Sequence, residues 1–130
     1  MSRLLAVMLV AGAAVAGLSW NHARTQEPNQ VADFMRHKLE HAKDILEGLS
    51  LEDYEMIAKN AQDLSLISLD STWQVLQTDE YARQSSEFRR TANALTKAAD
   101  NENLDGAALA YVELTMKCVN CHKYVRSVDD

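Results

Sequence analysis

The chain has 130 residues, of which 47% are hydrophobic and 25% are charged, so its length and composition suit a single globular domain. Glycine occurs four times and proline once, a composition that favours helices over strands. The 19 acidic residues outnumber the 13 basic ones, and the net charge of −6 argues against a nucleic-acid partner. We therefore expect an all-α protein that binds no nucleic acid.

The first 23 residues have the features of a secretory signal peptide. Arg3 gives a short positive start, and the uncharged apolar stretch from Leu4 to Leu18 follows it. Small residues offer cleavage after Ala16 or after Ala23. The stretch is shorter than the roughly 20 residues of a transmembrane helix, which favours cleavage over an uncleaved membrane anchor. In both cases the domain is exported, to the periplasm or another extracytoplasmic space, and stable membrane insertion is expected only if the signal stays uncleaved.

Residues 24–30 then form a polar leader that contains Pro28, and the folded domain is expected over residues 31–130. From Val31 to Leu49, side chains suited to one apolar face recur at spacings of three and four, which predicts a helix that Gly48 ends. This face consists of Val31, Phe34, Met35, Lys38, Leu39, Ala42, Ile45, Leu46 and Leu49.

A sequence that resembles a capping box, Ser50 to Asp53, is expected to open a second helix, with Leu51 already on its apolar side, and this helix should fade near Ser68. The pattern breaks over residues 69–78, which indicates a turn or one short helical piece. Trp73 lies in this break, and we expect its large side chain to close one end of the core.

The third helix is expected from Asp79 to about Ala99, with Thr78 as its cap. After a polar break, Asn103 can cap a fourth helix that runs to about Val125. Four amphipathic helices with short connections bury their apolar faces together most simply in an antiparallel four-helix bundle. This is the predicted fold of the domain.

The strongest motif of the sequence lies near the C-terminus, where Cys118-Val119-Asn120-Cys121-His122 reads C-x-x-C-H, the attachment motif of c-type haem. Two thiols one helical turn apart can add to the two vinyl groups of a haem. The histidine that follows can then present its imidazole to the iron. We predict one covalent haem c per chain, with thioethers to Cys118 and Cys121 and with His122 as proximal iron ligand.

Three other readings of the motif stay open. A thioredoxin-type dithiol normally stands at a helix start after a strand, whereas this motif ends the last helix of an all-α chain. A zinc site could combine the two thiolates with His37 and His41, which lie four residues apart. A chance motif without cofactor would leave two free thiols in an exported protein, where they are prone to oxidation.

The sixth position of a haem iron decides between electron transfer and gas binding. Met35 is the only methionine after the signal peptide that falls on the apolar face of its helix, so we predict it as the distal iron ligand. The alternative is that Met35 is simply a core residue. His41 lies near the edge of the face and His37 further towards solvent, so two histidine ligands are the less favoured arrangement.

The helix count and the position of the motif resemble the class II cytochromes c, the cytochrome c prime family. The resemblance covers residues 31–126 and includes Arg126, which matches a basic residue that the family has four places after the histidine. Tyr124 provides the aromatic residue of this segment, one place earlier than is usual in the family. The resemblance implies a four-helix bundle that carries its haem near the C-terminus.

Members of this family are either low-spin proteins, with methionine from the first helix as sixth ligand, or high-spin proteins that bind nitric oxide or carbon monoxide. Met35 is similar to the ligand of the low-spin branch, which implies electron transport with redox partner proteins and often a homodimer. The alternative function is a high-spin gas-binding or sensing module. No enzymatic activity is expected, because His41 is the only candidate for a proton-handling distal group.

Overall fold

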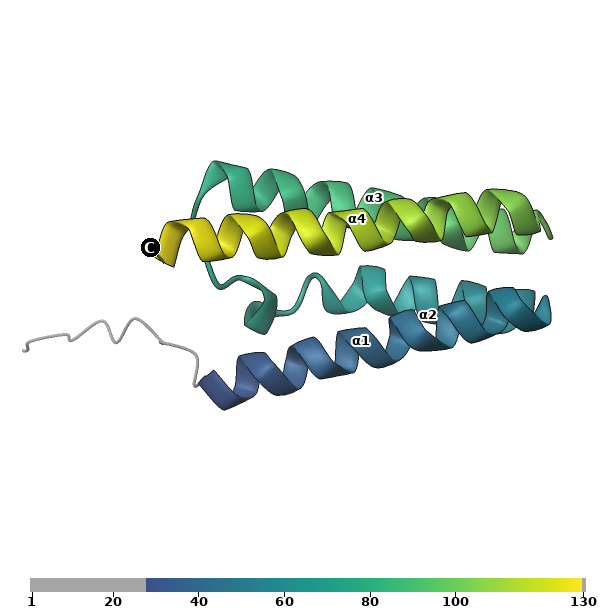
Figure 1. Cartoon of the computed structure of the whole chain (residues 1–130), viewed down its shortest axis with the longest axis horizontal. Helices are drawn as coiled ribbons and strands as arrows, with labels where there is room; N and C mark the ends of the chain where they lie inside the picture. Colours follow the sequence, from purple (N-terminus) through teal and green to yellow (C-terminus); the bar gives the residue numbers. More distant parts are fainter. Residues whose placement is uncertain (1–27, 130) are drawn as a thin grey trace, which may run out of the picture.

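The computed structural model describes residues 28–129, and within this range the chain forms four α-helices and one short 3-10 helix, with no β-strand (Figure 1). The prediction of an all-helical domain is confirmed. The predicted signal peptide and most of the predicted polar leader lie outside the described residues. The elements are α1 (Pro28–Leu51), α2 (Tyr54–Ile67), η1 (Ser71–Trp73), α3 (Asp79–Asp100) and α4 (Leu104–Asp129).

The helices are arranged side by side along one long axis. The α1–α2 and α3–α4 connections lie at one end, and the segment with η1 lies at the other end, near the C-terminus (Figure 1). Helix α2 packs along both α1 and α3, and α3 packs along α4, whereas α1 and α4 approach each other at fewer points. None of the helices within residues 28–129 is both long and apolar enough to cross a membrane.

Helix α1 starts earlier and ends later than the sequence pattern indicated. It begins at Pro28 rather than Val31, because proline is well tolerated in the first turn, where its missing N–H has no helical partner. The prediction that Gly48 ends the helix was wrong. The chain leaves the helix at Glu52, which has a positive φ of 55°, and the amide of Asp53 donates to the carbonyl of Gly48 at 2.9 Å.

Gly48 instead allows α1 and α2 to come close together. A Cβ at this position would lie 2.9 Å from Cγ1 of Ile57 and 3.2 Å from the carbonyl oxygen of Asp53. A side chain therefore cannot fit here without a shift of the two helices. The predicted capping box was wrong, because Ser50 lies inside α1 and its hydroxyl donates to the carbonyl of Leu46. Asp53 instead caps α2, since its carboxylate accepts the amide of Met56 at 2.9 Å.

The α3–α4 connection repeats this design. Glu102 has a φ of 53°, and the amide of Asn103 donates to the carbonyl of Ala98 at 2.9 Å. The Asn103 side chain accepts the amide of Gly106 at 2.9 Å, which confirms it as the cap of α4. The predicted cap of α3 is also confirmed, since the hydroxyl of Thr78 accepts the amide of the third helical residue.

The core is formed by all four helices, and Trp73 closes it near the end that carries η1. Trp73 is 2% exposed, as the sequence predicted, and its indole N–H donates to Oγ of Ser85 at 2.8 Å. The hydroxyl of Tyr81 donates to the Trp73 carbonyl. The prediction for Leu46 was wrong, because its side chain is 52% exposed. The fully buried apolar residues include Ile45, Ile57, Ala61, Leu64, Leu95, Ala99, Ala107 and Leu114.

Candidate cofactor site

A cleft lies between α1 and α4, and it consists of two neighbouring cavities of about 320 Å³ and about 170 Å³. Met35, Lys38 and His122 line both cavities. Cys118 lines the larger cavity and Cys121 the smaller one. The structure therefore brings the two cysteines, the histidine and the methionine singled out from the sequence to one place.

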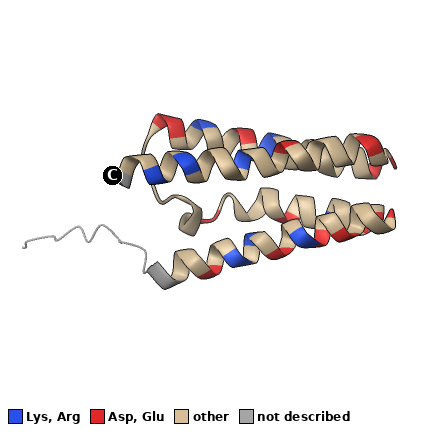
Figure 2. Cartoon of the chain, in the orientation of Figure 1, with Lys and Arg blue, Asp and Glu red and all other residues tan. Residues whose placement is uncertain are grey.

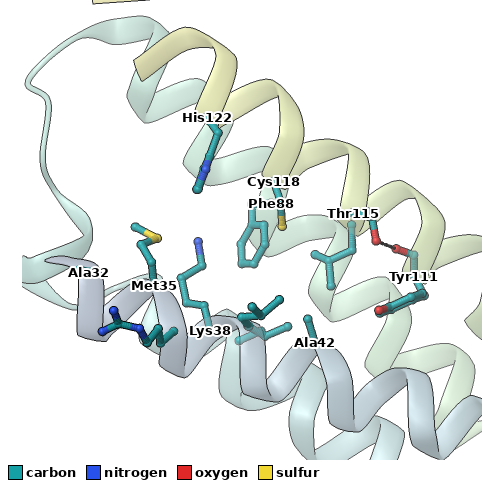
Figure 3. Close-up of a pocket in the computed structure, with 13 residues that line it drawn as sticks. Ala32, Met35, Lys38, Ala42, Phe88, Tyr111, Thr115, Cys118 and His122 are labelled. Carbon is teal, nitrogen blue, oxygen red and sulfur yellow. Dashed lines mark hydrogen bonds between the residues drawn. The ribbon is translucent and has the colours of Figure 1, made fainter. Parts of the chain in front are cut away.

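Helix α4 presents the C-x-x-C-H motif to this cleft because Cys118, Cys121 and His122 lie at i, i+3 and i+4 of a continuous helix. Both cysteines are free and partly buried. In Figure 3, His122 extends from α4 towards Met35 and Lys38, which rise from α1 on the facing wall. A group held between the two helices would meet the imidazole on one side and these two side chains on the other.

Burial affects the protonation of the two thiols and the imidazole that α4 presents to the cleft. It raises the pKa of the Cys118 thiol and of the Cys121 thiol, because the thiolate loses hydration in a partly apolar environment. Burial also lowers the pKa of His122, and the nearby charges of Lys38 and Arg126 lower it further. The site thus favours neutral thiols and a neutral imidazole, the form of histidine that can bind a metal.

The remaining lining of the larger cavity is mainly apolar. It includes Phe88 of α3, Leu64 of α2 and Leu114 of α4, all of which are buried core residues. Leu39 also lines it, but its side chain is 58% exposed. An apolar lining with a few polar groups is typical of cofactor and ligand sites.

Met35 differs from the other described methionines in its position relative to the cleft. Met35 lines both cavities, as the helical stripe predicted, whereas Met56 and Met116 line neither. Met116 is 50% exposed on the outer surface of α4. The periodicity argument thus selected the one thioether that faces the cleft.

Lys38 is a site residue whose role sequence reasoning missed. Its position three residues after Met35 placed it on the apolar face, but a lysine there normally extends its amine to solvent. Here Nζ turns inward and lies 3.6 Å from the centroid of the Trp73 ring and 5.0 Å from that of Phe88. Burial lowers the pKa of Lys38 to about 8, although the cysteine thiolates would oppose this shift. No carboxylate within residues 30–128 forms an ion pair with Lys38.

His37 and His41 lie outside the cleft. Nδ1 of His41 is 2.8 Å from Oδ1 of Asn60 on α2, and the two imidazoles approach to 3.3 Å between their Nε2 atoms. Neither histidine lines the cavities between α1 and α4. Among the side chains of residues 30–128, no three His, Cys, Asp or Glu groups come together as a metal site. The positions of His37 and His41 therefore support neither two histidine ligands nor the zinc alternative.

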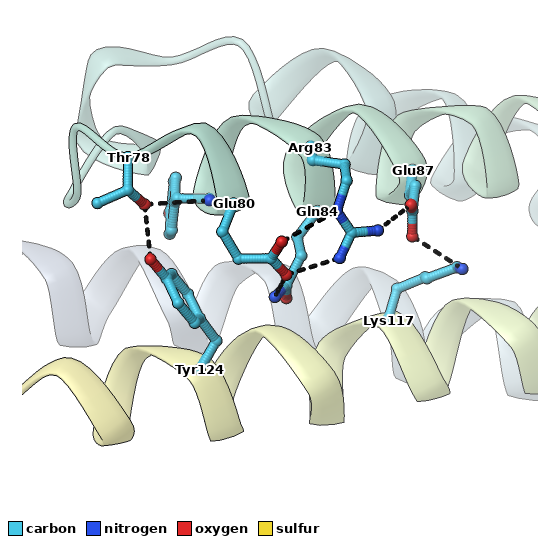
Figure 4. Close-up of polar contacts among 8 residues, drawn as sticks. Thr78, Glu80, Arg83, Gln84, Glu87, Lys117 and Tyr124 are labelled. Carbon is cyan, nitrogen blue, oxygen red and sulfur yellow. Dashed lines mark hydrogen bonds and ion pairs between the residues drawn. The ribbon is translucent and has the colours of Figure 1, made fainter.

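Polar contacts fasten the motif-bearing part of α4 to α3 (Figure 4). The hydroxyls of Thr78 and Tyr124 are 2.8 Å apart, two residues beyond His122 along α4. Lys117, just before the motif, pairs with Glu87 at 3.3 Å, and Glu87 also pairs with Arg83. The cysteines and the histidine are thus held on a helix that is anchored on both sides of the motif.

Comparisons with protein-family models, with curated proteins and with solved structures found no match to this chain. The chemistry of the cleft is therefore the basis for assigning a function. It combines two neutral thiols, an imidazole, a thioether and an amine around an apolar space.

Proposed function

We propose that this chain is an exported monohaem c-type cytochrome that transfers electrons, built as an antiparallel four-helix bundle like the class II cytochromes c. One observation carries the proposal: Cys118, Cys121, His122 and Met35 all line the same cleft between α1 and α4.

The donor groups of the cleft fit a haem. A thioether forms when the S–H of a cysteine adds across a vinyl group, and burial keeps both cysteines in the thiol form before that reaction. Cys118 and Cys121 lie at different halves of the cleft, as the attachment of one flat group at two points requires. The larger cavity, about 320 Å³, also falls within the range of roughly 300 to 1,000 Å³ that ligand sites occupy.

In this proposal, His122 is the proximal ligand and Met35 the distal ligand. A haem bound there supplies a one-electron iron couple. The chain would hold such a group between His122 on α4 and Met35 on α1, among apolar residues that would keep water away and limit rearrangement of the site. A thioether ligand would raise its reduction potential.

The facing wall of the cleft favours electron transfer over gas binding. A five-coordinate gas-binding haem needs an open distal side that no protein ligand fills. Here α1 directs two side chains with donor atoms, Met35 and Lys38, into that side. The high-spin, gas-binding alternative therefore has less support than electron transfer, and the test below distinguishes the two.

The charge near the motif indicates the kind of redox partner. Beyond the motif, α4 carries the exposed Lys123 and Arg126, with no acidic residue between Glu113 and Asp129, whereas Lys117 is paired with Glu87 and Glu113. Acidic residues are frequent around the two tight turns at the far end (Figure 2). The local positive charge favours a partner that docks an acidic surface near the motif.

The test is to express the full chain in a bacterium that attaches haem c outside the cytoplasm, and to measure its mass and optical spectrum. We expect the mass of one haem above the polypeptide, with cleavage after residue 16 or 23. We also expect a low-spin spectrum with a thioether-to-iron band at the red end of the oxidised form. Met35→Ala should lose this band, and Met116→Ala should keep it as the matched control.

A colourless protein with only the polypeptide mass would refute the proposal. A haem protein that is high-spin and binds carbon monoxide without displacing a ligand would support the gas-binding alternative instead.

A further inference from the structure

Lys38 occupies an unusual position for a lysine. Its side chain is partly buried, and its amine lies against the faces of Trp73 and Phe88 rather than in water. The titratable groups that share the cleft with it from α4 are Tyr111, Cys118, Cys121, His122 and Arg126, and Tyr81 faces it from α3. No carboxylate within residues 30–128 forms an ion pair with the Lys38 amine. A buried ammonium without a counter-ion is costly, and contact with aromatic rings offsets only part of that cost.

Simple packing does not explain this geometry. A lysine that only covers apolar surface keeps its charged end in solvent. Lys38 instead lines both cavities together with Met35 and His122, and Figure 3 shows its amine directed across the cleft towards α4. Met35 and Lys38 lie one helical turn apart on the same face, so both can reach a group that His122 contacts from the other side.

We propose that Lys38 is a second distal ligand, whose amine takes the sixth position of the iron whenever the Met35 thioether leaves it. This inference rests on the proposed haem attachment. In the exchange, the bond between iron and the Met35 sulfur breaks, a bond between iron and Nζ of Lys38 forms, and the ammonium releases one proton to water. The oxidation state of the iron does not change.

The apolar surroundings assist this exchange. They lower the pKa of Lys38 to about 8, so the neutral amine, the form that carries a free electron pair, is more accessible near neutral pH than in an exposed lysine. The cysteine thiolates, which would oppose this effect, no longer exist once both sulfurs are thioethers. Lys38 thus keeps the distal side closed, which makes it a determinant of electron transfer over gas binding.

The experiment compares spin states of the haem-loaded protein, by optical and electron paramagnetic resonance spectra of the oxidised form. Met35→Ala should lose the thioether band and yet remain low-spin. The double variant Met35→Ala/Lys38→Leu should become high-spin and bind carbon monoxide in its reduced form without ligand displacement. Met35→Ala/Lys43→Leu, which changes an exposed lysine of the same helix, is the matched control and should remain low-spin.

A second double variant distinguishes the loss of a ligand from a folding defect. Met35→Ala/Lys38→Arg keeps the positive charge, but a guanidinium stays protonated and does not ligate, so this protein should also become high-spin. Helix content from circular dichroism should match that of the parent in every variant.

Two results would overturn the inference: a high-spin Met35→Ala protein, or a low-spin Met35→Ala/Lys38→Leu protein. A parent that lacks the thioether band and becomes high-spin on Lys38→Leu alone would support Lys38 ligation and remove Met35 from the proposed ligand pair. A parent without haem would refute the proposed function itself, which separates the two failures.

Discussion

Trp73 connects the closed end of the core to the cleft. Its indole N–H donates to Ser85, its carbonyl accepts from Tyr81, and its ring packs against Phe88 with a centroid distance of 5.0 Å. The same ring supports the Lys38 amine. The orientation of Trp73 therefore affects both the stability of the domain and the shape of the candidate site.

The first prediction concerns the partner of the indole. Ser85→Ala should lower the free energy of unfolding by about 1 to 3 kcal/mol, because a buried N–H is left without an acceptor. Urea unfolding followed by circular dichroism measures this change. Ser86→Ala, at the exposed neighbouring position, should change the stability by less than about 0.5 kcal/mol. Equal effects of the two substitutions would contradict the role given to the Ser85 hydroxyl.

Single residues differed in how well the sequence predicted their position. Cys118, Cys121 and His122 have fixed spacing on one helix, so local geometry alone places them on one face. Met35 followed from periodicity in the same way. The inward orientation of the Lys38 side chain did not follow from periodicity. It depends on contacts with aromatic rings of η1 and α3, which are distant in sequence.

At the scale of the elements, the two tight turns share one construction. Each ends a helix with a glutamate in the left-handed region, Glu52 or Glu102, and then begins the next helix with an Asp or Asn cap. The Asn103 cap was predicted from the sequence because it follows local hydrogen-bonding rules. The Asp53 cap was not, because the pattern that resembled a capping box indicated Ser50 as the cap. The end of α1 was misplaced, because Gly48 was read as a stop signal although its small size serves the contact between helices.

The second prediction tests that contact. Gly48→Ala should destabilise the protein by about 1 to 3 kcal/mol, because the new Cβ would press on Ile57 and on the backbone of Asp53. This steric effect opposes the higher helix propensity of alanine, which is worth about 1 kcal/mol. Thermal unfolding of Gly48→Ala and of the exposed control Glu47→Ala would measure the difference. A stabilised Gly48→Ala protein would show that α1 and α2 are not held closely at this point.

At the scale of the whole molecule, α3 and α4 are joined by charged side chains next to the motif. Hydrogen bonds from Lys117, and then the charge of Arg83, lower the pKa of Glu87. The pKa of Glu87 is lower in the folded state than its ordinary value of 4.5. The ionised carboxylate therefore stabilises the folded state at pH values above about 4.5. This contribution is lost as the pH falls through the folded pKa.

The third prediction follows from the lowered pKa of Glu87 in the folded state. The melting temperature of the parent should exceed that of Glu87→Gln near neutral pH, and the difference should shrink as the pH falls below about 4.5. Lys117→Met should remove most of the same pH dependence, because Lys117 is the main cause of the shift. Melting curves of the parent and the two variants between pH 7 and about 3 would measure it. A constant difference over this range would contradict a role for Glu87 in joining the helices.

The sequence alone determined the all-helical character of the domain, two of the helix caps, Thr78 and Asn103, and the grouping of the motif residues on one helical face. These features depend on interactions over a few residues, which a linear pattern records. Only the tertiary structure decided that α1 and α4 enclose a cleft, that His41 turns towards α2, and that Lys38 turns inwards beside Met35. Each of these depends on side chains brought together from different helices, and no local spacing encodes such contacts.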